Sequence, residues 1–195
     1  MILRLATRAD APGMLAIYGP VVQASYASFA VEPPTVEEIE GQIEQTLAHF
    51  PWLVCTEGDQ ILGYAYAGPH RSRAGYRWAT EVSVYVHPEA HRQGIARALY
   101  TALFALLAAQ GFVNVYAGIA LPNEASVALH EALGFQQTAH YRQIGFKTHA
   151  WRDTGWWHRR INPLDPDPAP PTSLTKLDAA EMETALAEGT ALLRT

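Results

Sequence analysis

The stretch WATEVSVYVHPEAHRQGIA, residues 78–96, contains a strand pattern, a glycine-bearing turn and the start of a helix. Val82, Val84 and Val86 alternate with polar and aromatic residues, at the two-residue period of a strand. The valines therefore share one face, which we expect in the core, and Glu81 lies on the opposite face. That opposite face is free to carry a functional carboxylate.

The turn after this strand leads directly into a helix. Residues 91–96, HRQGIA, open a run with apolar residues at helical spacing, namely Ile95, Leu99, Leu103 and Leu106. Backbone N–H groups at a helix N-terminus, the positive end of the helix dipole and the nearby Arg92 and Arg97 favour a phosphate or pyrophosphate. The alternative is an ordinary helix start with no ligand.

The rest of the chain alternates strand and helix patterns, which predicts an α/β (α+β) fold with a mixed central sheet flanked by helices. Asp10 is expected to cap the first helix, and Thr35 to Glu38 resemble a capping box. The expected strands cover residues 2–6, 52–55, 61–66, 79–86, 113–119 and 135–141, and the expected helices cover 11–24, 36–48, 94–109 and 124–133.

The last part of the chain changes character. Residues 163–171, PLDPDPAPP, contain five prolines and cannot form a helix or a central strand. We therefore predict a domain at 1–162, a Pro-rich linker at 163–174, and an amphipathic helix or disordered tail at 175–195. The sequence leaves open whether that helix docks on its own domain, docks on a second subunit or is disordered.

Composition excludes several classes of function. The chain has 195 residues, a net charge of −5 and no basic run, so nucleic acid is not an expected partner. No apolar run approaches the roughly 20 residues that span a bilayer, so no membrane partner is expected. The first residues lack the apolar segment of a signal peptide, and Cys55 is the single cysteine, so we expect a cytoplasmic protein.

Two histidines at metal-ligand spacing do not make a convincing metal site. His87 and His91 are four residues apart, but Pro88 and the turn prevent the one-face helical arrangement of a zinc pair. We predict no metal.

Several ordered motifs resemble a known family. The turn His91-x-x-Gly94-x-Ala96, the segment Asn123-Glu-Ala-Ser126 and the run LHEALGF at 129–135 resemble the coenzyme A-binding core of the GCN5-related N-acetyltransferases (GNAT). Within that superfamily, the chain is most similar to the phosphinothricin and methionine sulfoximine N-acetyltransferases, over about residues 2–161. The resemblance implies the GNAT fold, acetyl-CoA as cosubstrate, a small-molecule amine substrate and a homodimer.

Glu81 is the candidate catalytic base. An amine must lose a proton before it attacks a thioester, and Glu81 is the only acid in the strand next to the anion-binding turn. The resemblance implies the same role. The alternative is a solvated or salt-bridged glutamate, with Arg77 nearby.

His130 is the second catalytic candidate. It lies four residues after Ser126 and therefore shares a helical face with it. Many GNAT relatives have a tyrosine here, thought to protonate the departing thiolate, whereas the phosphinothricin branch has histidine. His130 could donate a proton, hydrogen-bond the base or intermediate, or only bond a backbone carbonyl and pack.

Backbone groups are expected to bind most of the cosubstrate. N–H groups in the turn would hold the pyrophosphate, and N–H groups at 83–85 would polarise the thioester carbonyl. The family prefers Arg or Gln at the position of His91 and often has Gly at the position of Ala96. Both changes leave the backbone N–H donors in place. The expected cosubstrate contacts are Val84, Val86, His91, Arg92, Gln93, Gly94, Ile95, Ala96, Asn123 and Ser126.

A polar loop before the Glu81 strand, residues 68–76, is expected to form the lip of the acceptor site. The resemblance implies substrate contacts by Arg71, Arg73, Tyr76 and Phe29, with guanidinium groups suited to carboxylate or phosphinate oxygens. A solvated basic loop is the alternative. Ala30 replaces an arginine of close relatives and Arg77 an aspartate of resistance enzymes, which suits a broader, methionine sulfoximine-like specificity.

The sequence therefore predicts transfer of acetyl from acetyl-CoA to the α-amino group of a small amino-acid-like substrate, by direct attack in a ternary complex. One alternative is a GNAT enzyme for another amine, such as a polyamine or a protein N-terminus. The other is a non-catalytic acyl-CoA-binding module, against which Glu81 and His130 count.

Overall fold

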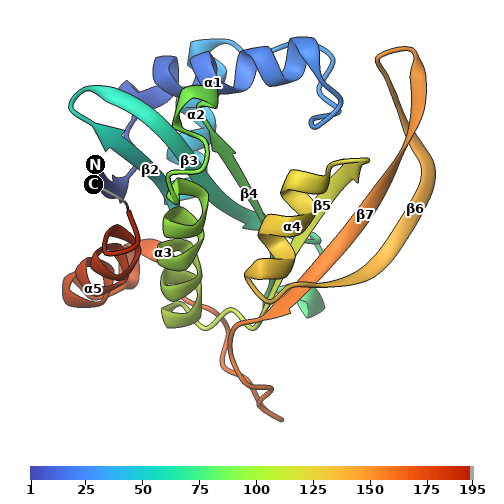
Figure 1. Ribbon diagram of the computed structural model, residues 1–195. Helices are drawn as coiled ribbons and strands as arrows, with labels where there is room; N and C mark the ends of the chain where they lie inside the picture. Colours follow the sequence, from blue (N-terminus) through green and yellow to red (C-terminus); the bar gives the residue numbers. More distant parts are fainter. Residues whose placement is uncertain (194–195) are drawn as a thin grey trace.

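The computed structural model describes residues 1–193, which fold into one seven-stranded sheet with helices on both faces (Figure 1). The strands are β1 (Ile2–Leu5), β2 (Trp52–Glu57), β3 (Gln60–Pro69), β4 (Ala79–Val86), β5 (Asn114–Leu121), β6 (Gln136–Lys147) and β7 (Ala150–Arg160). The α-helices are α1 (Ala11–Ala24), α2 (Val36–Leu47), α3 (Ile95–Ala109), α4 (Glu124–Ala132) and α5 (Ala179–Thr190). The predicted mixed sheet flanked by helices is confirmed.

The sheet order is β1-β2-β3-β4-β5-β7-β6, and every neighbouring pair is antiparallel except β4 and β5. The parallel pair follows from the crossover through α3. Its ladder covers only three register positions and ends where Glu81 lies opposite Tyr116. Beyond Glu81 the two central strands separate, so a gap opens in the middle of the sheet.

The central strand and helix form as their sequence predicts. Val82 is buried, and Val84 and Val86 pack against the same core, which confirms the apolar face of β4. Gly94 is the N-cap of α3 and has a φ of 84°, a left-handed conformation that favours glycine. Gly111, with a φ of 93°, follows the end of the helix as expected.

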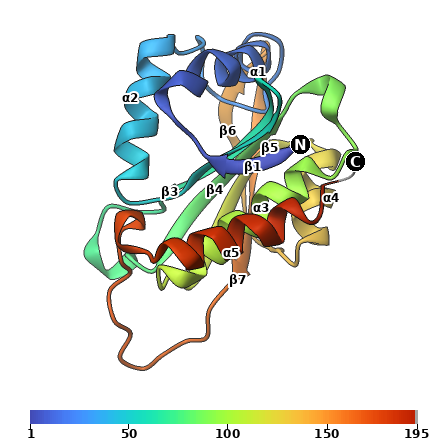
Figure 2. The same cartoon turned by 90° about the vertical axis from the view of Figure 1, so that its left-hand side faces the viewer.

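Helices cover both faces of the sheet. Helices α1 and α2 pack on one face over the apolar residues of β2 and β3. Helices α3 and α5 lie on the other face, with α5 packed against α3 and β1 (Figures 1 and 2). The β6–β7 hairpin extends to one side of this body (Figure 1).

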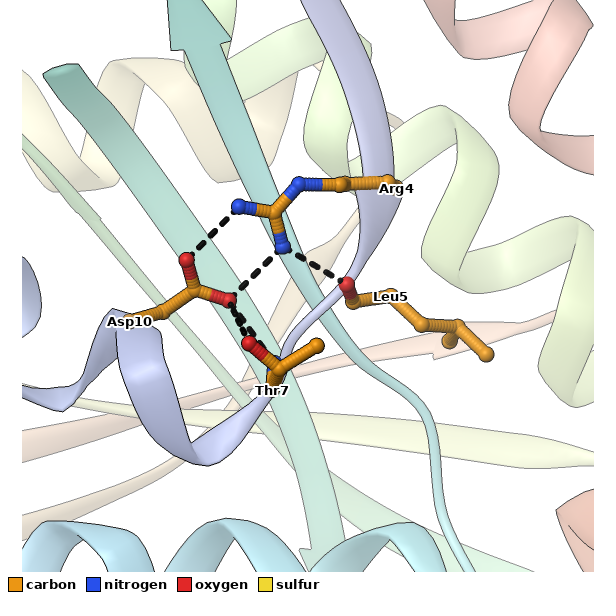
Figure 3. Close-up of polar contacts among 4 residues, drawn as sticks. All are labelled: Arg4, Leu5, Thr7 and Asp10. Atoms are coloured by element: carbon orange, nitrogen blue, oxygen red, sulfur yellow. Dashed lines mark hydrogen bonds and ion pairs between the residues drawn. The ribbon is translucent and has the colours of Figure 1, made fainter. Parts of the chain in front are cut away.

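The connection from β1 to α1 is fixed by a buried carboxylate (Figure 3). Asp10 precedes α1 as predicted, but its side chain does not cap that helix. It accepts two hydrogen bonds from the Arg4 guanidinium, at 2.6 and 2.7 Å, and one from the backbone N–H of Thr7 at 2.7 Å. Burial raises the pKa of Asp10, but the bonds from Arg4 and Thr7 outweigh it and leave that pKa below the ordinary value.

The C-terminal segment docks on its own domain. The Pro-rich residues 163–171 form no helix or strand, and the Gln110 side chain then donates to the carbonyl oxygens of His49 and Thr172. In α5, Ala185 is buried and Gly189 lies close to α3 and β1, so the apolar stripe predicted from the sequence faces the domain. Residues 194 and 195 of the predicted tail lie outside the described part. Within residues 1–193, no helix is long and apolar enough to cross a membrane.

Candidate active site

Glu81 lies at the last position where β4 pairs with β5, and its side chain contacts His70. Oε1 of Glu81 is 2.8 Å from Nδ1 of His70, the residue that follows β3. Gly68 is the register partner of Glu81, so His70, two residues further on, falls on the same face of the sheet. The His70 ring also stacks on Tyr116, with centroids 4.4 Å apart and an interplanar angle of 12°.

The backbone edge of β4 faces the gap between the central strands. The N–H of His87 bonds Leu62 O in β3 at 2.8 Å, whereas the carbonyl oxygen of Val86 accepts from Nε2 of His91 at 3.1 Å. Along a strand, the backbone N–H and C=O groups of successive residues point alternately to one neighbouring strand and to the other. Val84, two residues before Val86, therefore also points its N–H and C=O away from β3 and into the gap. The valines expected to contact the cosubstrate thus present backbone groups as well as side chains there.

A cavity of about 290 Å³ occupies this gap. Its walls are mainly β4, β5 and α4, and His91, Tyr100 of α3 and Val21 of α1 also line it. The lining residues that the sequence singled out are Val84, Val86, His91, Asn123, Ser126 and His130.

The turn before α3 stands at the mouth of this cleft. His91 joins the turn to β4 through its bond to Val86, and Gln93 donates to Glu89 O at 3.4 Å. Arg92 and His91 are exposed, Ile95 is buried under the turn, and Ala96 lies in its first helical residues. The four residues 93–96 therefore start a 15-residue helix with their N–H groups at its positive end.

Acetyl-CoA fits these features. An elongated thioester needs a slot with open backbone donors, and its pyrophosphate needs a helix N-terminus free of bulky side chains. The gap beside Val84 meets the first requirement. At the second, Gly94 carries no side chain, and the carbonyl oxygen of Leu192 lies 3.2 Å from the position that a Cβ on Gly94 would take.

At the other wall of the cleft, α4 begins with an Asn123 cap and carries His130. Asn123 accepts the N–H of Ser126 at 3.1 Å, which fixes the first turn of the helix. Nδ1 of His130 lies 2.7 Å from the carbonyl oxygen of Ser126, and Nε2 lies 3.2 Å from the hydroxyl of Tyr100. A carbonyl only accepts, so Nδ1 carries the hydrogen and Nε2 accepts from Tyr100.

His130 and Tyr100 are both sealed from solvent. His130 is 3% exposed, and burial lowers its pKa more than the bond to Ser126 raises it. Burial also raises the pKa of Tyr100. Both side chains are therefore neutral, and His130 is a hydrogen-bond acceptor at the atom nearer Tyr100.

The predicted acceptor residues fall in two places. Arg71, Arg73 and Tyr76 line a hollow of about 560 Å³, together with Arg77 and the C-terminal residues 170–173. Phe29 lies elsewhere, with its ring against Gly145 of β6. Lys147 holds the Phe29 loop to this hairpin, since Nζ donates to Ser28 O at 2.7 Å and to Ala30 O at 2.6 Å.

Sequence reasoning missed His70 and Tyr100. His70 stands in a stretch that reads as a polar loop, but β3 continues to Pro69 and fixes its direction. Tyr100 stands in an apolar helical run, where its hydroxyl was the only signal of a polar contact. Among residues 1–193, no three His, Cys, Asp or Glu side chains gather as metal ligands would.

Comparisons with known proteins agree with this geometry. Residues 3–156 match the family model of the acetyltransferase (GNAT) domain. A phosphinothricin N-acetyltransferase from Streptomyces viridochromogenes is 38% identical over 172 residues, which cover 88% of this chain and 94% of that protein. An L-methionine sulfoximine/L-methionine sulfone acetyltransferase from Salmonella typhimurium is 34% identical, over 78% of this chain and 90% of that protein.

A solved structure is similar over the same range. The phosphinothricin acetyltransferase from Sinorhizobium meliloti, in complex with acetyl-CoA, superimposes with a TM-score of 0.80 at 32% identity, covering 88% of this chain and 97% of that chain. With most of its length matched, the chain belongs to the acetyltransferase (GNAT) family of acyltransferase enzymes.

Proposed function

We propose that this protein transfers the acetyl group of acetyl-CoA to the α-amino group of a small amino-acid-like acceptor, by direct attack in a ternary complex. The observation that carries the proposal is the position of Glu81, a carboxylate at the point where β4 and β5 part. A base at this point reaches an amine on one side of the sheet, next to the backbone edge of Val84. The relatives named for phosphinothricin and methionine sulfoximine support this class of acceptor.

In this proposal the chain's own groups bind and orient both substrates. The N–H groups of 93–96 hold the pyrophosphate, and the N–H of Val84 hydrogen-bonds the thioester carbonyl. Acetyl-CoA supplies the activated acetyl group. Glu81 removes a proton from the ammonium of the acceptor, which frees the lone pair that attacks the thioester carbon. The C–S bond then breaks, and the CoA thiolate leaves and takes its proton from the nitrogen that has gained the acetyl group.

His130 acts in this scheme by holding Tyr100. Because Nδ1 is bonded to Ser126 and Nε2 accepts, the imidazole has no free N–H to give. Of the roles left open by the sequence, an orienting role in the wall of the cleft fits this hydrogen bonding best.

Arg71 and Arg73 are proposed to recognise the carboxylate of the acceptor. They line one hollow with Arg77, and the residues that line it include no acidic side chain. Guanidinium groups bind carboxylates through paired N–H donors, so this hollow suits the carboxylate of an amino acid better than a polyamine.

We also propose a homodimer formed through the β6–β7 hairpin. Strand β6 is an edge of the sheet, and the hairpin exposes Ile144, Phe146 and Trp151, the last with 61% of its surface accessible. An exposed apolar edge strand favours association with a second copy. Sedimentation should give a dimer for the wild type and for Leu164→Glu, a control at another exposed apolar residue, and a monomer for Ile144→Glu. A monomeric wild type at micromolar concentration would contradict the proposal.

A cytoplasmic location completes the proposal. Cys55 is the sole cysteine, and it is buried and free, as is usual in a reducing compartment.

The test is release of free CoA thiol from acetyl-CoA across phosphinothricin, methionine sulfoximine, methionine sulfone, other amino acids, polyamines and N-terminal peptides. Turnover of the amino-acid-like compounds supports the proposal. Turnover of polyamines or peptides alone would show that the acceptor belongs to that class instead. Glu81→Gln should lower kcat by about a hundredfold or more without changing the Kd of acetyl-CoA. Glu57→Gln, at the exposed end of β2, is the control. Acetyl-CoA binding without turnover of any acceptor would favour the non-catalytic module.

A further inference from the structure

The carboxylate of Glu81 has one anchored oxygen and one free oxygen. Nδ1 of His70 lies 2.8 Å from Oε1, and a carboxylate only accepts, so His70 donates this hydrogen bond. Within residues 1–193, no other group hydrogen-bonds the Glu81 side chain. Oε2 therefore stays available to an incoming amine, while Oε1 fixes the plane of the carboxylate.

His70 is itself held firmly. Its ring lies flat on Tyr116 of β5 and meets the edge of Trp156 of β7, with centroids 5.6 Å apart and an interplanar angle of 73°. The side chain is 14% exposed, against 38% for Glu81. Stacked and edge-to-face contacts favour particular orientations of a ring, so the two neighbours help to fix the direction of the His70 side chain. His70, the more buried of the two side chains, thus restrains Glu81.

The location of this contact matters for the cleft. Tyr116 is the register partner of Glu81 at the last paired position of β4 and β5. His70 comes from the end of β3, yet its ring rests on β5 and β7, so it bridges the two halves of the sheet where they begin to part. A shift of His70 would move Glu81 relative to the strand on the far side of the gap.

The geometry points to His70 as a positioning residue that acts through Glu81, holding its carboxylate toward the acceptor amine. The inference rests on the proposed function of Glu81 as the base. A misplacement of about 1 Å in such a group costs up to about a hundredfold in rate, whereas the binding of acetyl-CoA does not depend on it. His70 should therefore affect kcat and leave the Kd of acetyl-CoA unchanged.

Two substitutions separate the hydrogen bond from the packing. His70→Phe keeps a flat ring between Tyr116 and Trp156 but removes the donor. His70→Asn keeps an N–H donor near the position of Nδ1 but removes the ring. His140→Phe is the control, because His140 forms a second histidine–carboxylate pair, with Asp153 at 2.6 Å, away from Glu81.

The measurement is steady-state kinetics with the best acceptor of the panel, together with acetyl-CoA affinity. We expect His70→Phe to lower kcat by roughly ten- to a hundredfold with acetyl-CoA affinity intact, and His70→Asn, which keeps a donor but not the ring contacts that hold it, to lose clearly less of kcat than His70→Phe. Wild-type kinetics in His70→Phe would overturn the inference, and so would equal losses in both variants, since the retained donor would then have no effect.

A second readout does not need turnover. In a long-range ¹H–¹⁵N spectrum, at a pH where free histidine is neutral, His70 should be the Nδ1–H tautomer, and Glu81→Ala should release it to the mixture usual in water. An Nε2–H tautomer in the wild type would overturn the inference. Failure of every acceptor in the kinetic assay would count against the proposed function instead, and the spectrum would still decide whether His70 holds Glu81.

Discussion

The hydroxyl of Tyr100 donates to Nε2 of His130 across 3.2 Å, between two side chains that are almost fully buried. Tyr100→Phe removes the donor and leaves Nε2 without a partner, which should lower the free energy of unfolding by about 1–2 kcal/mol. Urea denaturation measures the loss, and Tyr76→Phe, at an exposed tyrosine, should have almost no effect. In a double-mutant cycle, Tyr100→Phe should cost little once His130 is replaced by Phe. Additive losses would show that the two residues do not interact.

The neutral state of His130 predicts a pH dependence of stability. Burial lowers its pKa in the folded protein, so the unfolded chain binds the proton first as the pH falls. The stability that neutral His130 provides is complete above about pH 7 and is lost progressively as the pH falls below about 6.5, the pKa of an unperturbed histidine. Below that pH, the wild type should lose more unfolding free energy than His130→Gln, which cannot titrate. If the free energies of unfolding of the two proteins changed with pH in parallel, His130 would have the same pKa in the folded and the unfolded chain.

The ionised carboxylate of Asp10 predicts a loss of folding stability at lower pH. The bonds from Arg4 and Thr7 favour its ionised form, so its contribution is present at neutral pH and disappears as the pH falls below about 4. Asp10→Asn should cost about 1–2 kcal/mol at neutral pH, a range kept low because Arg4 is 37% exposed. The difference from wild type should shrink in acid. Asp59→Asn, in the exposed β2–β3 turn, serves as the control, and a constant difference at all pH values would contradict the assignment.

Two glycines inside helices predict opposite effects of the same substitution. A Cβ on Gly189 of α5 would lie 2.6 Å from Ala98 O and 2.7 Å from Cδ1 of Leu3, so Gly189→Ala should push α5 off α3 and β1. A Cβ on Gly41 of α2 meets nothing within 4 Å, so Gly41→Ala should stabilise by about 0.5–1 kcal/mol. Thermal denaturation and proteolysis of the C-terminal segment measure both. Stabilisation in both variants would mean that α5 does not pack this closely.

Local patterns in the sequence predicted most of the fold. The valine alternation of β4, the Gly94 turn and the capping box at Thr35 each depend on neighbours within a few residues, and each occurs as expected. The docking of α5 was left open because an amphipathic stripe does not reveal which surface it covers. The small side chains of Ala98 and Ala102, which admit Gly189, decide it here.

The candidate site was less accessible to such reasoning. Glu81 could be singled out as an acid on the open face of a strand, but its partner His70 is eleven positions away in sequence and meets it only through the register of β3 and β4. The roles of Glu81, His130 and the cosubstrate residues stay predictions that the proposed experiments address. Long-range register and helix packing, which no single segment encodes, determine these contacts.

The short ladder between β4 and β5 leaves two strand edges facing each other inside the sheet. The pairing ends at Glu81 and Tyr116, so beyond that point neither strand has the other as a hydrogen-bonding neighbour. An edge of this kind is usually found at the outer border of a sheet, where it offers backbone groups to a partner. A longer ladder would make a more rigid sheet, but it would close the slot on which the proposed chemistry depends.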